Sequence, residues 1–324
     1  MTAGFEIEWV VGCPGQGPGP HPFVPALLGG PYGADRLIDG LDYFTAVAEG
    51  LDQAGLAWHQ LHPEYGPAQL ELSLAPASPL AAADALVLAR LVIQRVSRRL
   101  GLCCSFSPVV APGLVGNGGH LHFSLEQQGQ PLFGPGPGPG GLTPAGETVV
   151  AGLLHHLPAL MPLACALAVS YRRLVPGTWS APYAAWGIEN REAALRLVPA
   201  APDGVPPHLE LKIADLSANP YLLVGAVAAV VREALATPRS LAPPVEGDPS
   251  RHPQPPQRLP QDLQAATAAF QASGLLRLAM GDLLHRTLVE ARQAELRRSA
   301  ELSPEDLIAS TRWWPLGDQN SSGC

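Results

Sequence analysis

Six acidic or imidazole side chains stand on stretches whose apolar neighbours predict strands. Glu6 and Glu8 are separated by one residue, so a strand would place both on the same face. A buried carboxylate is unfavourable unless a positive group meets it. Each residue taken singly could lie on the solvent face of its strand, but together they predict a site for positive charge. The six residues are Glu6, Glu8, Glu64, Glu71, His120 and Glu210.

The types of these side chains indicate hard divalent cations. Oxygen ligands with few imidazoles suit Mg²⁺ or Mn²⁺, and five carboxylates with one imidazole would serve two such ions. Paired hard cations are typical of phosphate chemistry, where they offset charge on the transferred group. Gln69 shares a face with Glu71, and His122 shares one with His120, so further polar groups accompany the six.

Basic residues supply the opposite charge. The chain holds 20 lysine and arginine residues, and Lys212 is its only lysine. Lys212 follows Glu210 by two positions, so the two could form an ordinary surface pair or part of a site for a cation and an acidic substrate. Arg191 and Arg196 lie in "ENREAALR". An extended segment would point them to opposite faces, so a bend is needed if both are to reach one site.

A glycine-rich loop, "VGNGGHLH", runs into the strand that carries His120 and His122. Gly116 and Gly118 have no side chains, so the backbone there can approach a ligand closely. The same glycines are equally compatible with a tight hairpin.

Strands and helices alternate irregularly around these residues, which favours an α+β class with a mainly antiparallel sheet. In the helix that Ser78 caps, Ala85, Leu88, Val92 and Val96 share one face. A very apolar stretch, 152–170, contains two prolines and indicates a buried, broken helix. We expect strands at 4–12, 103–110, 120–125, 193–200 and 208–215, with two more within 56–76. We expect helices at 41–54, 78–101, 143–170 and 219–235, and two within 261–324.

The composition of the chain limits which partners it could bind and in which compartment it could work. Hydrophobic residues make up 47% of the 324 residues, enough for a substantial core, and the formal net charge is −8. An acidic chain without basic runs argues against nucleic acid as a partner. The five cysteines include no CxxC pair and indicate neither a disulfide framework nor a zinc site. Glu6 and Glu8 occupy the place of an apolar signal segment, so we expect a cytoplasmic protein that does not enter a membrane.

Six segments in order resemble the catalytic domain of glutamine synthetases, ATP-dependent ligases that join an amine to the γ-carboxylate of glutamate. The resemblance covers roughly residues 4–235. It implies the curved, mainly antiparallel sheet with flanking helices that these enzymes share with guanido kinases. We therefore expect a catalytic domain at 1–236, a proline-rich connector at 237–260, and C-terminal helices packed on that domain at 261–324. The six segments are "GFEIEW", "HPEYGPAQLEL", "GNGGHLHFSL", "SYRRLVPG", "AAWGIENREAALR" and "LELKIADLSANPYL".

The resemblance also implies a role for each matched residue. One Mg²⁺ or Mn²⁺ ion would be held by Glu8, Glu64 and Glu71, and the other by Glu6, His120 and Glu210. Glutamate would contact Gly116, Gly118, Arg173 and Lys212. ATP would contact His122, Ser124 and Arg196. Charge on the transferred phosphate would be offset by Arg191 and Arg196, and Lys212 stands where the family usually has an arginine. The implied reaction passes through a γ-glutamyl phosphate and serves glutamine biosynthesis or related nitrogen metabolism.

The chain departs from the family pattern at several places. Trp179 occupies the position of a flap glutamate that helps to bind ammonium, and could be a packing anchor or an apolar wall for an organic amine. His208 and Val109 replace basic residues near ATP. The family's N-terminal β-grasp domain has no counterpart before Glu6. A homo-oligomer is expected, with a separate polypeptide as a conceivable source of that domain.

These departures leave three functional hypotheses. The first is a ligase acting on ammonia or a small amine. The second is a non-catalytic regulatory or binding protein on the same fold, and the third is a phosphagen-type kinase. Retention of all six acidic and imidazole residues favours the ligase.

Overall fold

The fold is described from a computed structural model, which describes residues 1–13, 23–200 and 204–313. Its strands are β1 Thr2–Cys13, β2 Val24–Pro25, β3 Trp58–Pro63, β4 Gln69–Leu74, β5 Cys103–Ser105, β6 Leu121–Ser124, β7 Glu126–Gln127, β8 Gln130–Pro131, β9 Trp186–Ile188, β10 Leu195–Val198 and β11 His208–Leu211. Its α-helices are α1 Ala34–Asp39, α2 Leu41–Gln53, α3 Pro79–Arg99, α4 Pro144–Ala164, α5 Ser170–Arg173, α6 Pro220–Ala236, α7 Leu263–Gln271, α8 Gly274–Ser299 and α9 Pro304–Arg312. Short 3₁₀ turns occur at Pro139–Gly141 and Pro249–Arg251.

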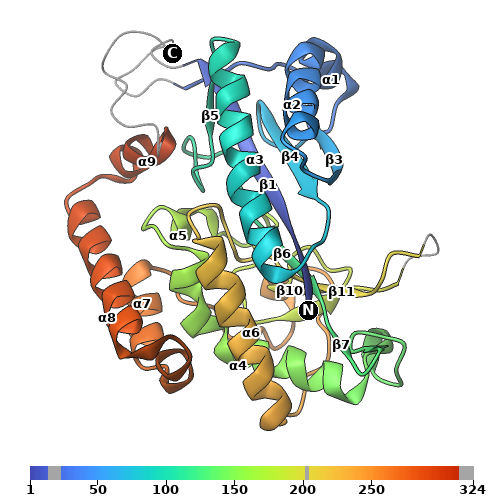
Figure 1. Ribbon diagram of the computed structural model, residues 1–324. Coiled ribbons are helices and arrows are strands. Elements are labelled where there is room, and N and C mark those ends of the chain that lie inside the picture. The colour runs from blue at the N-terminus through green and yellow to red at the C-terminus, as the bar shows by residue number, and fades with distance from the viewer. Residues whose placement is uncertain (14–22, 201–203, 314–324) are drawn as a thin grey trace.

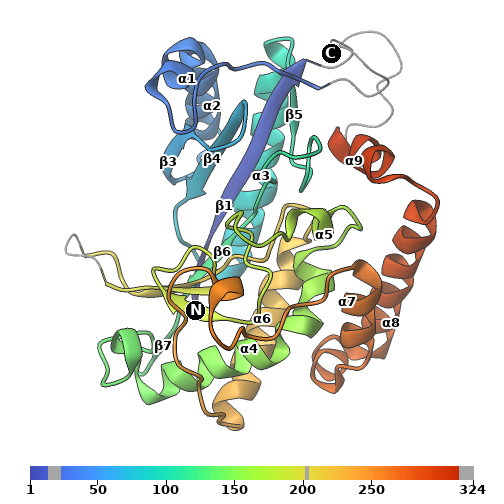
Figure 2. The ribbon, with the colours of Figure 1, turned by 180° about the vertical axis from the view of Figure 1, so that it is seen from behind.

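One large sheet organises the chain, and Figures 1 and 2 show helices α3, α4 and α6 along one side of it. Its strand order is β3-β4-β1-β6-β11-β10-β9, with β2 and β5 also paired to β1. The pairs are antiparallel except β9 with β10, which is parallel. The α+β class with a mainly antiparallel sheet, expected from the sequence, is therefore confirmed.

Strand β1 is the spine of the sheet because it changes partners along its length. Its first residues pair with β6, its middle with β4 and its end with β5. The alternation of side chains along β1 sends Phe5, Ile7 and Trp9 into the core, where each is at most 2% exposed. Glu6 and Glu8 therefore point to the opposite face.

The long helices begin where the sequence predicts, but the buried face of α3 differs in part from the predicted one. The Thr143 hydroxyl accepts from the N-terminal backbone of α4, and the Asn219 side chain does the same for α6. Ser78 occupies the N-cap position of α3, but its side chain makes no capping hydrogen bond. The face predicted for α3 is right only in part. Val96 is buried and Ala85 and Val92 pack against the core, but Leu88 is 40% exposed and Leu86 is buried in its place.

Helix α4 runs unbroken from Pro144 to Ala164, although Pro158 and Pro162 lie inside it. The predicted break therefore comes after the prolines, between α4 and α5, rather than at them. None of the helices in the described ranges is long and apolar enough to cross a membrane.

The C-terminal region holds three described helices where two were expected. Helix α7 packs on α4, and α8 packs on α7 and α6. The segment 237–260 runs beside the strand β9 region, because the backbone nitrogen of Val245 donates to the Trp186 carbonyl at 2.8 Å. Cys13, Cys104 and Cys165 are free thiols, and Cys324 lies outside the described residues.

Candidate active site

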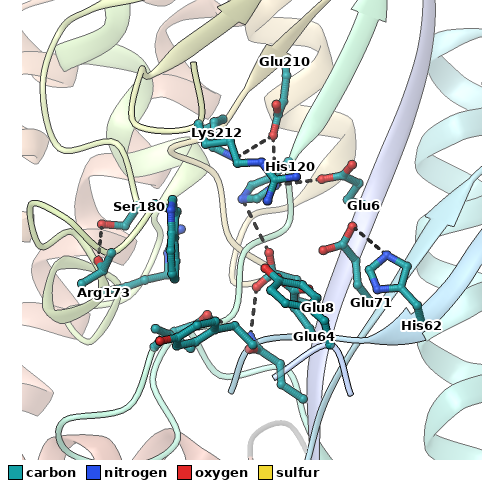
Figure 3. A pocket seen from close by; sticks show the side chains of 18 of the residues that line it. Glu6, Glu8, His62, Glu64, Glu71, His120, Arg173, Ser180, Glu210 and Lys212 are labelled. Atoms are coloured by element: carbon teal, nitrogen blue, oxygen red, sulfur yellow. Dashed lines mark hydrogen bonds and ion pairs between the residues drawn. The ribbon is translucent and has the colours of Figure 1, made fainter. Parts of the chain in front are cut away.

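All six predicted acidic and imidazole residues line one cavity of about 280 Å³ on the side of β1 that carries Glu6 and Glu8. Figure 3 shows Glu210, Lys212 and His120 together, with Glu71 and His62 on one side of the cavity and Arg173 and Ser180 across from them. The full set of predicted donors that line it is Glu6, Glu8, Glu64, Glu71, His120 and Glu210.

Strand register explains why residues so far apart in sequence meet. Glu8 on β1 lies opposite Glu71 on β4, and Glu71 lies opposite His62 on β3. Residues directly opposite in an antiparallel pair point to the same face, so these side chains form a row across three strands. A second row joins Arg196 on β10 to Glu210 on β11 and then to His122 on β6. Residues in adjacent loops complete the enclosure.

Glu210 and His122 of the second row form a compact group with Glu6 and His120. His120 Nδ1 lies 2.9 Å from Glu6 Oε2 and 3.2 Å from Glu210 Oε1. His122 Nε2 lies 3.2 Å from Glu6 Oε1. One ligand atom each from Glu6, His122 and Glu210 lie within 4.8 Å of one another, which is a spacing that could hold a metal ion.

Electrostatics in this group favour charged forms. Burial alone would raise the pKa of Glu6, but the nearby His122 and hydrogen bonds to both imidazoles outweigh it and hold that pKa well below its usual range. Burial likewise opposes ionisation of Glu210, while Lys212 and His122 lower its pKa far more. The pKa values of His120 and His122 are raised because the carboxylates outweigh the effect of burial.

The carboxylate of Glu8 is fixed by neutral donors. Gln69 Nε2 donates to Glu8 Oε2 at 3.1 Å, and the backbone nitrogen of Gly118 donates to the same oxygen at 2.8 Å. A Cβ at Gly118 would lie 2.2 Å from His120 Nε2, and a Cβ at Gly116 would lie 2.4 Å from Arg173 Cγ. The glycines of the predicted loop are therefore required for close packing at the cavity wall.

The carboxyl groups of Glu64 and Glu71 are repelled by neighbouring carboxylates, and the basic side chains of the described residues offset this repulsion only in part. Burial raises the pKa of Glu71 well above its usual range, and repulsion from Glu6, Glu8 and Glu64 raises it further. Burial also raises the pKa of Glu64, although Tyr32 donates to its Oε1 at 2.8 Å. A cavity of this kind would bind added positive charge favourably.

Lys212 is 5% exposed and donates from Nζ to Glu210 Oε1 at 2.9 Å. Arg196 NH1 donates to the other oxygen, Glu210 Oε2, at 3.3 Å, and its NH2 contacts Glu189. The two cations therefore hold Glu210 from both sides. Burial opposes the charge of Arg196, but Glu210 and Glu189 together raise its pKa.

The remaining predicted residues divide into those at the cavity and those behind it. Gly116, Arg173, Trp179 and Arg191 line it, so the turn before β10 supplies the bend that lets Arg191 and Arg196 converge. Arg173 NH2 donates to the backbone carbonyls of β11's following turn. Gly118 and His122 contact Glu8 and Glu6 without lining the cavity, and Ser124 does not line it either.

Sequence reasoning missed several lining residues. Tyr32 and Tyr65 stand in loops, and His62 is the residue before the last in strand β3. Tyr65 directly follows Glu64 in "HPEYGP", and that adjacency to a predicted donor was the one available signal. Trp179 was foreseen, and it packs edge-to-face on Tyr65 with ring centroids 4.8 Å apart.

Known proteins are similar to this chain over most of its length. The family model "Glutamine synthetase, catalytic domain" matches residues 20–308. A gamma-glutamylpolyamine synthetase, GlnA3 of Streptomyces coelicolor, is 39% identical over 322 residues, which cover 97% of this chain and 68% of that protein. Glutamine synthetase of Methanocaldococcus jannaschii is 29% identical over 283 residues, covering 85% of this chain and 62% of the relative.

A solved structure described as a GmaS/ADP complex superposes with a TM-score of 0.82 at 25% identity, covering 93% of this chain and 70% of that one. The match to a family model over most of the length, the identity to GlnA3 and the shared architecture show that this chain belongs to the glutamine synthetase family.

Proposed function

We propose that the protein is an ATP-dependent ligase that joins an organic amine to the γ-carboxylate of glutamate through a γ-glutamyl phosphate. The observation that carries this proposal is the convergence of six carboxylate and imidazole residues with Arg173, Arg191, Arg196 and Lys212 around one cavity. A site with both signs of charge suits a reaction between an acidic substrate and a nucleotide phosphate.

The residues fit two hard divalent cations. The donor set is rich in carboxylate oxygens, and burial, followed by repulsion from the neighbouring carboxylates, raises the pKa of Glu71. Mg²⁺ or Mn²⁺ would be held by Glu8, Glu64 and Glu71 on one side and by Glu6, His120 and Glu210 on the other. Such ions supply charge neutralisation for the phosphate groups of ATP.

Two steps follow for the substrates. A γ-carboxylate oxygen of glutamate attacks the terminal phosphorus of ATP, and the bond from that phosphorus to the bridging oxygen breaks to release ADP. The amine nitrogen then attacks the acyl carbon, loses a proton, and displaces inorganic phosphate. Arg191, Arg196 and Lys212 line the cavity as fixed cations and would offset charge on the transferred group.

An organic amine is favoured over ammonia for two reasons. Trp179 stands at the position where the resemblance places an ammonium-binding glutamate, and its ring lines the cavity. The relative with 39% identity is named for γ-glutamylation of polyamines. Polyamines are thus the first class of amine to test.

The test is product formation by the purified full chain. We would incubate it with ATP, glutamate and Mg²⁺ or Mn²⁺, add 1,4-diaminobutane or hydroxylamine, and look for the γ-glutamyl product by mass spectrometry. Glu210→Gln should abolish product, whereas Glu290→Gln, at an exposed position on α8, is the matched control and should not. Metal binding without product from any amine would instead favour a non-catalytic role.

A further inference from the structure

Three aromatic rings form a row on the wall of the cavity. Tyr65 and Trp179 pack edge-to-face, and Tyr32 packs edge-to-face on the other side of Tyr65 with centroids 6.2 Å apart. Tyr32, Tyr65 and Trp179 are 51%, 40% and 39% exposed, and all three line the cavity. Trp9 and Trp186 are at most 1% exposed and serve as core anchors. Trp179 is thus not a packing anchor of the same kind, because much of its ring is open.

The backbone that presents Trp179 is held in an unusual conformation. Its φ is 57°, in the left-handed region that bulky residues rarely adopt and that persists only where surrounding contacts fix it. Those contacts are present. The backbone nitrogen of Trp179 donates to Glu192 Oε1 at 3.0 Å. The hydroxyls of Thr178 and Ser180 both donate to the Val175 carbonyl, at 2.7 and 2.9 Å.

The aromatic row leads directly to the carboxylates. The Tyr32 hydroxyl donates to Glu64 Oε1 at 2.8 Å, so one end of the row adjoins the acidic cluster. Ring faces attract ammonium groups and pack against methylene chains. Ammonia has no chain to place on such a wall, whereas a di- or polyamine could lie along it with one nitrogen directed toward the cluster.

Building on the proposed function, we propose that Tyr65 and Trp179 bind the methylene chain and distal ammonium of a di- or polyamine substrate, and that Glu192 positions Trp179 for this contact. Tyr65 and Trp179 would then set the preference for long over short amines. Glu192 would act through the backbone of Trp179, because its carboxylate oxygen accepts the hydrogen bond from that nitrogen.

We would measure the binding of 1,4-diaminobutane and of methylamine to the full chain by calorimetric titration in the presence of Mg²⁺. This measurement tests the contacts of Tyr65 and Trp179 with the amine separately from turnover. Tyr65→Ala and Trp179→Ala should each raise the Kd of the diamine about tenfold, and Trp179→Phe should retain most of the affinity. The Kd of methylamine should change much less. Tyr221→Ala is the matched control, since Tyr221 is 41% exposed on α6 and bonds Asp84 away from the cavity.

Glu192 is tested by a pair of variants. Glu192→Gln keeps a side-chain oxygen for the Trp179 nitrogen and should bind the diamine within about twofold of wild type, while Glu192→Ala should weaken diamine binding as Trp179→Ala does. The ratio of diamine to methylamine affinity separates positioning from general loss of structure, since misfolding would weaken both ligands.

The outcomes separate this inference from the proposed function. A wild-type protein that binds the diamine but forms no γ-glutamyl product from any amine would refute the ligase and leave the aromatic site standing. Wild type that binds no diamine would overturn the aromatic site, as would Tyr65→Ala and Trp179→Ala proteins whose diamine affinity equals that of wild type. Equal diamine binding in both Glu192 variants would overturn the positioning role.

Discussion

Removing the ammonium of Lys212 should destabilise the folded protein strongly, because it pairs with a carboxylate that is almost completely buried. Lys212 is 5% and Glu210 is 1% exposed, and their charged atoms lie 2.9 Å apart. At an effective dielectric constant of about 20, two unit charges at this distance attract by about 6 kcal/mol. Desolvation of both groups offsets much of that attraction.

Loss of one partner leaves the other charge buried, which typically costs about 3–5 kcal/mol of unfolding free energy. The charge of Glu210 is also offset by Arg196, His120 and His122, which lie close to it. We therefore expect Lys212→Met to lower the free energy of unfolding by about 3 kcal/mol, the lower end of that range. The assay is urea unfolding followed by fluorescence and circular dichroism in metal-free buffer.

A double variant tests the cause of the loss. Lys212→Met combined with Glu210→Gln removes both charges and should recover at least half of the destabilisation. Arg286→Met is the matched control, because Arg286 pairs with Glu290 at 4.0 Å with both side chains 67% exposed, and it should change stability by less than about 0.5 kcal/mol. The reasoning is refuted if Lys212→Met lies within about 1 kcal/mol of wild type, or if the double variant equals the sum of the single ones.

Three further predictions concern the site and its support. Lys212→Arg should lower kcat/KM about tenfold, because the larger guanidinium would be crowded at a position where the lysine is only 5% exposed. Unchanged kinetics would contradict the idea that this position requires the smaller cation. Gly118→Ala would place a Cβ 2.2 Å from His120 Nε2 and should abolish the rise in Tm on adding Mn²⁺, whereas Gly225→Ala, with open space around it, should keep that rise; equal responses would contradict the packing argument. Burial lowers the pKa of His156 below its ordinary 6.5, so this residue binds fewer protons in the folded than in the unfolded state, and its contribution to stability should fall as pH drops below about 6.5. The raised pKa values of His120 and His122 act in the opposite direction, so the check is the difference in Tm between wild type and His156→Gln: it should move in favour of the variant as pH falls, and a difference that stays constant with pH would contradict it.

The acidic cluster could be predicted because its residues alternate along strands. Glu6 and Glu8 flank Ile7, and the apolar residues on either side assign them to a single face without any knowledge of the partner strands. The order of strands and their register could not be read from the sequence, because pairings between β1, β4, β6 and β11 are set by packing across the whole sheet. Family resemblance supplied that missing information.

The row of three aromatic rings at the cavity could not be predicted from local sequence pattern. Tyr32 and Tyr65 stand in loops, where no periodicity assigns a direction to a side chain, and the left-handed backbone of Trp179 depends on a contact with Glu192 from another segment. Helix α3 shows a related limit. Its ends follow from Pro79 and Gly101, but alanine and leucine are spread so evenly around it that periodicity selected a face including the exposed Leu88.

The path of an oxygen atom tests the proposed γ-glutamyl phosphate most directly. We would supply glutamate labelled with ¹⁸O in its γ-carboxylate, together with ATP, Mg²⁺ and 1,4-diaminobutane, and measure the mass of the inorganic phosphate formed. Transfer through the acyl phosphate predicts that each phosphate carries one ¹⁸O atom from glutamate. Product formation with unlabelled phosphate would contradict it.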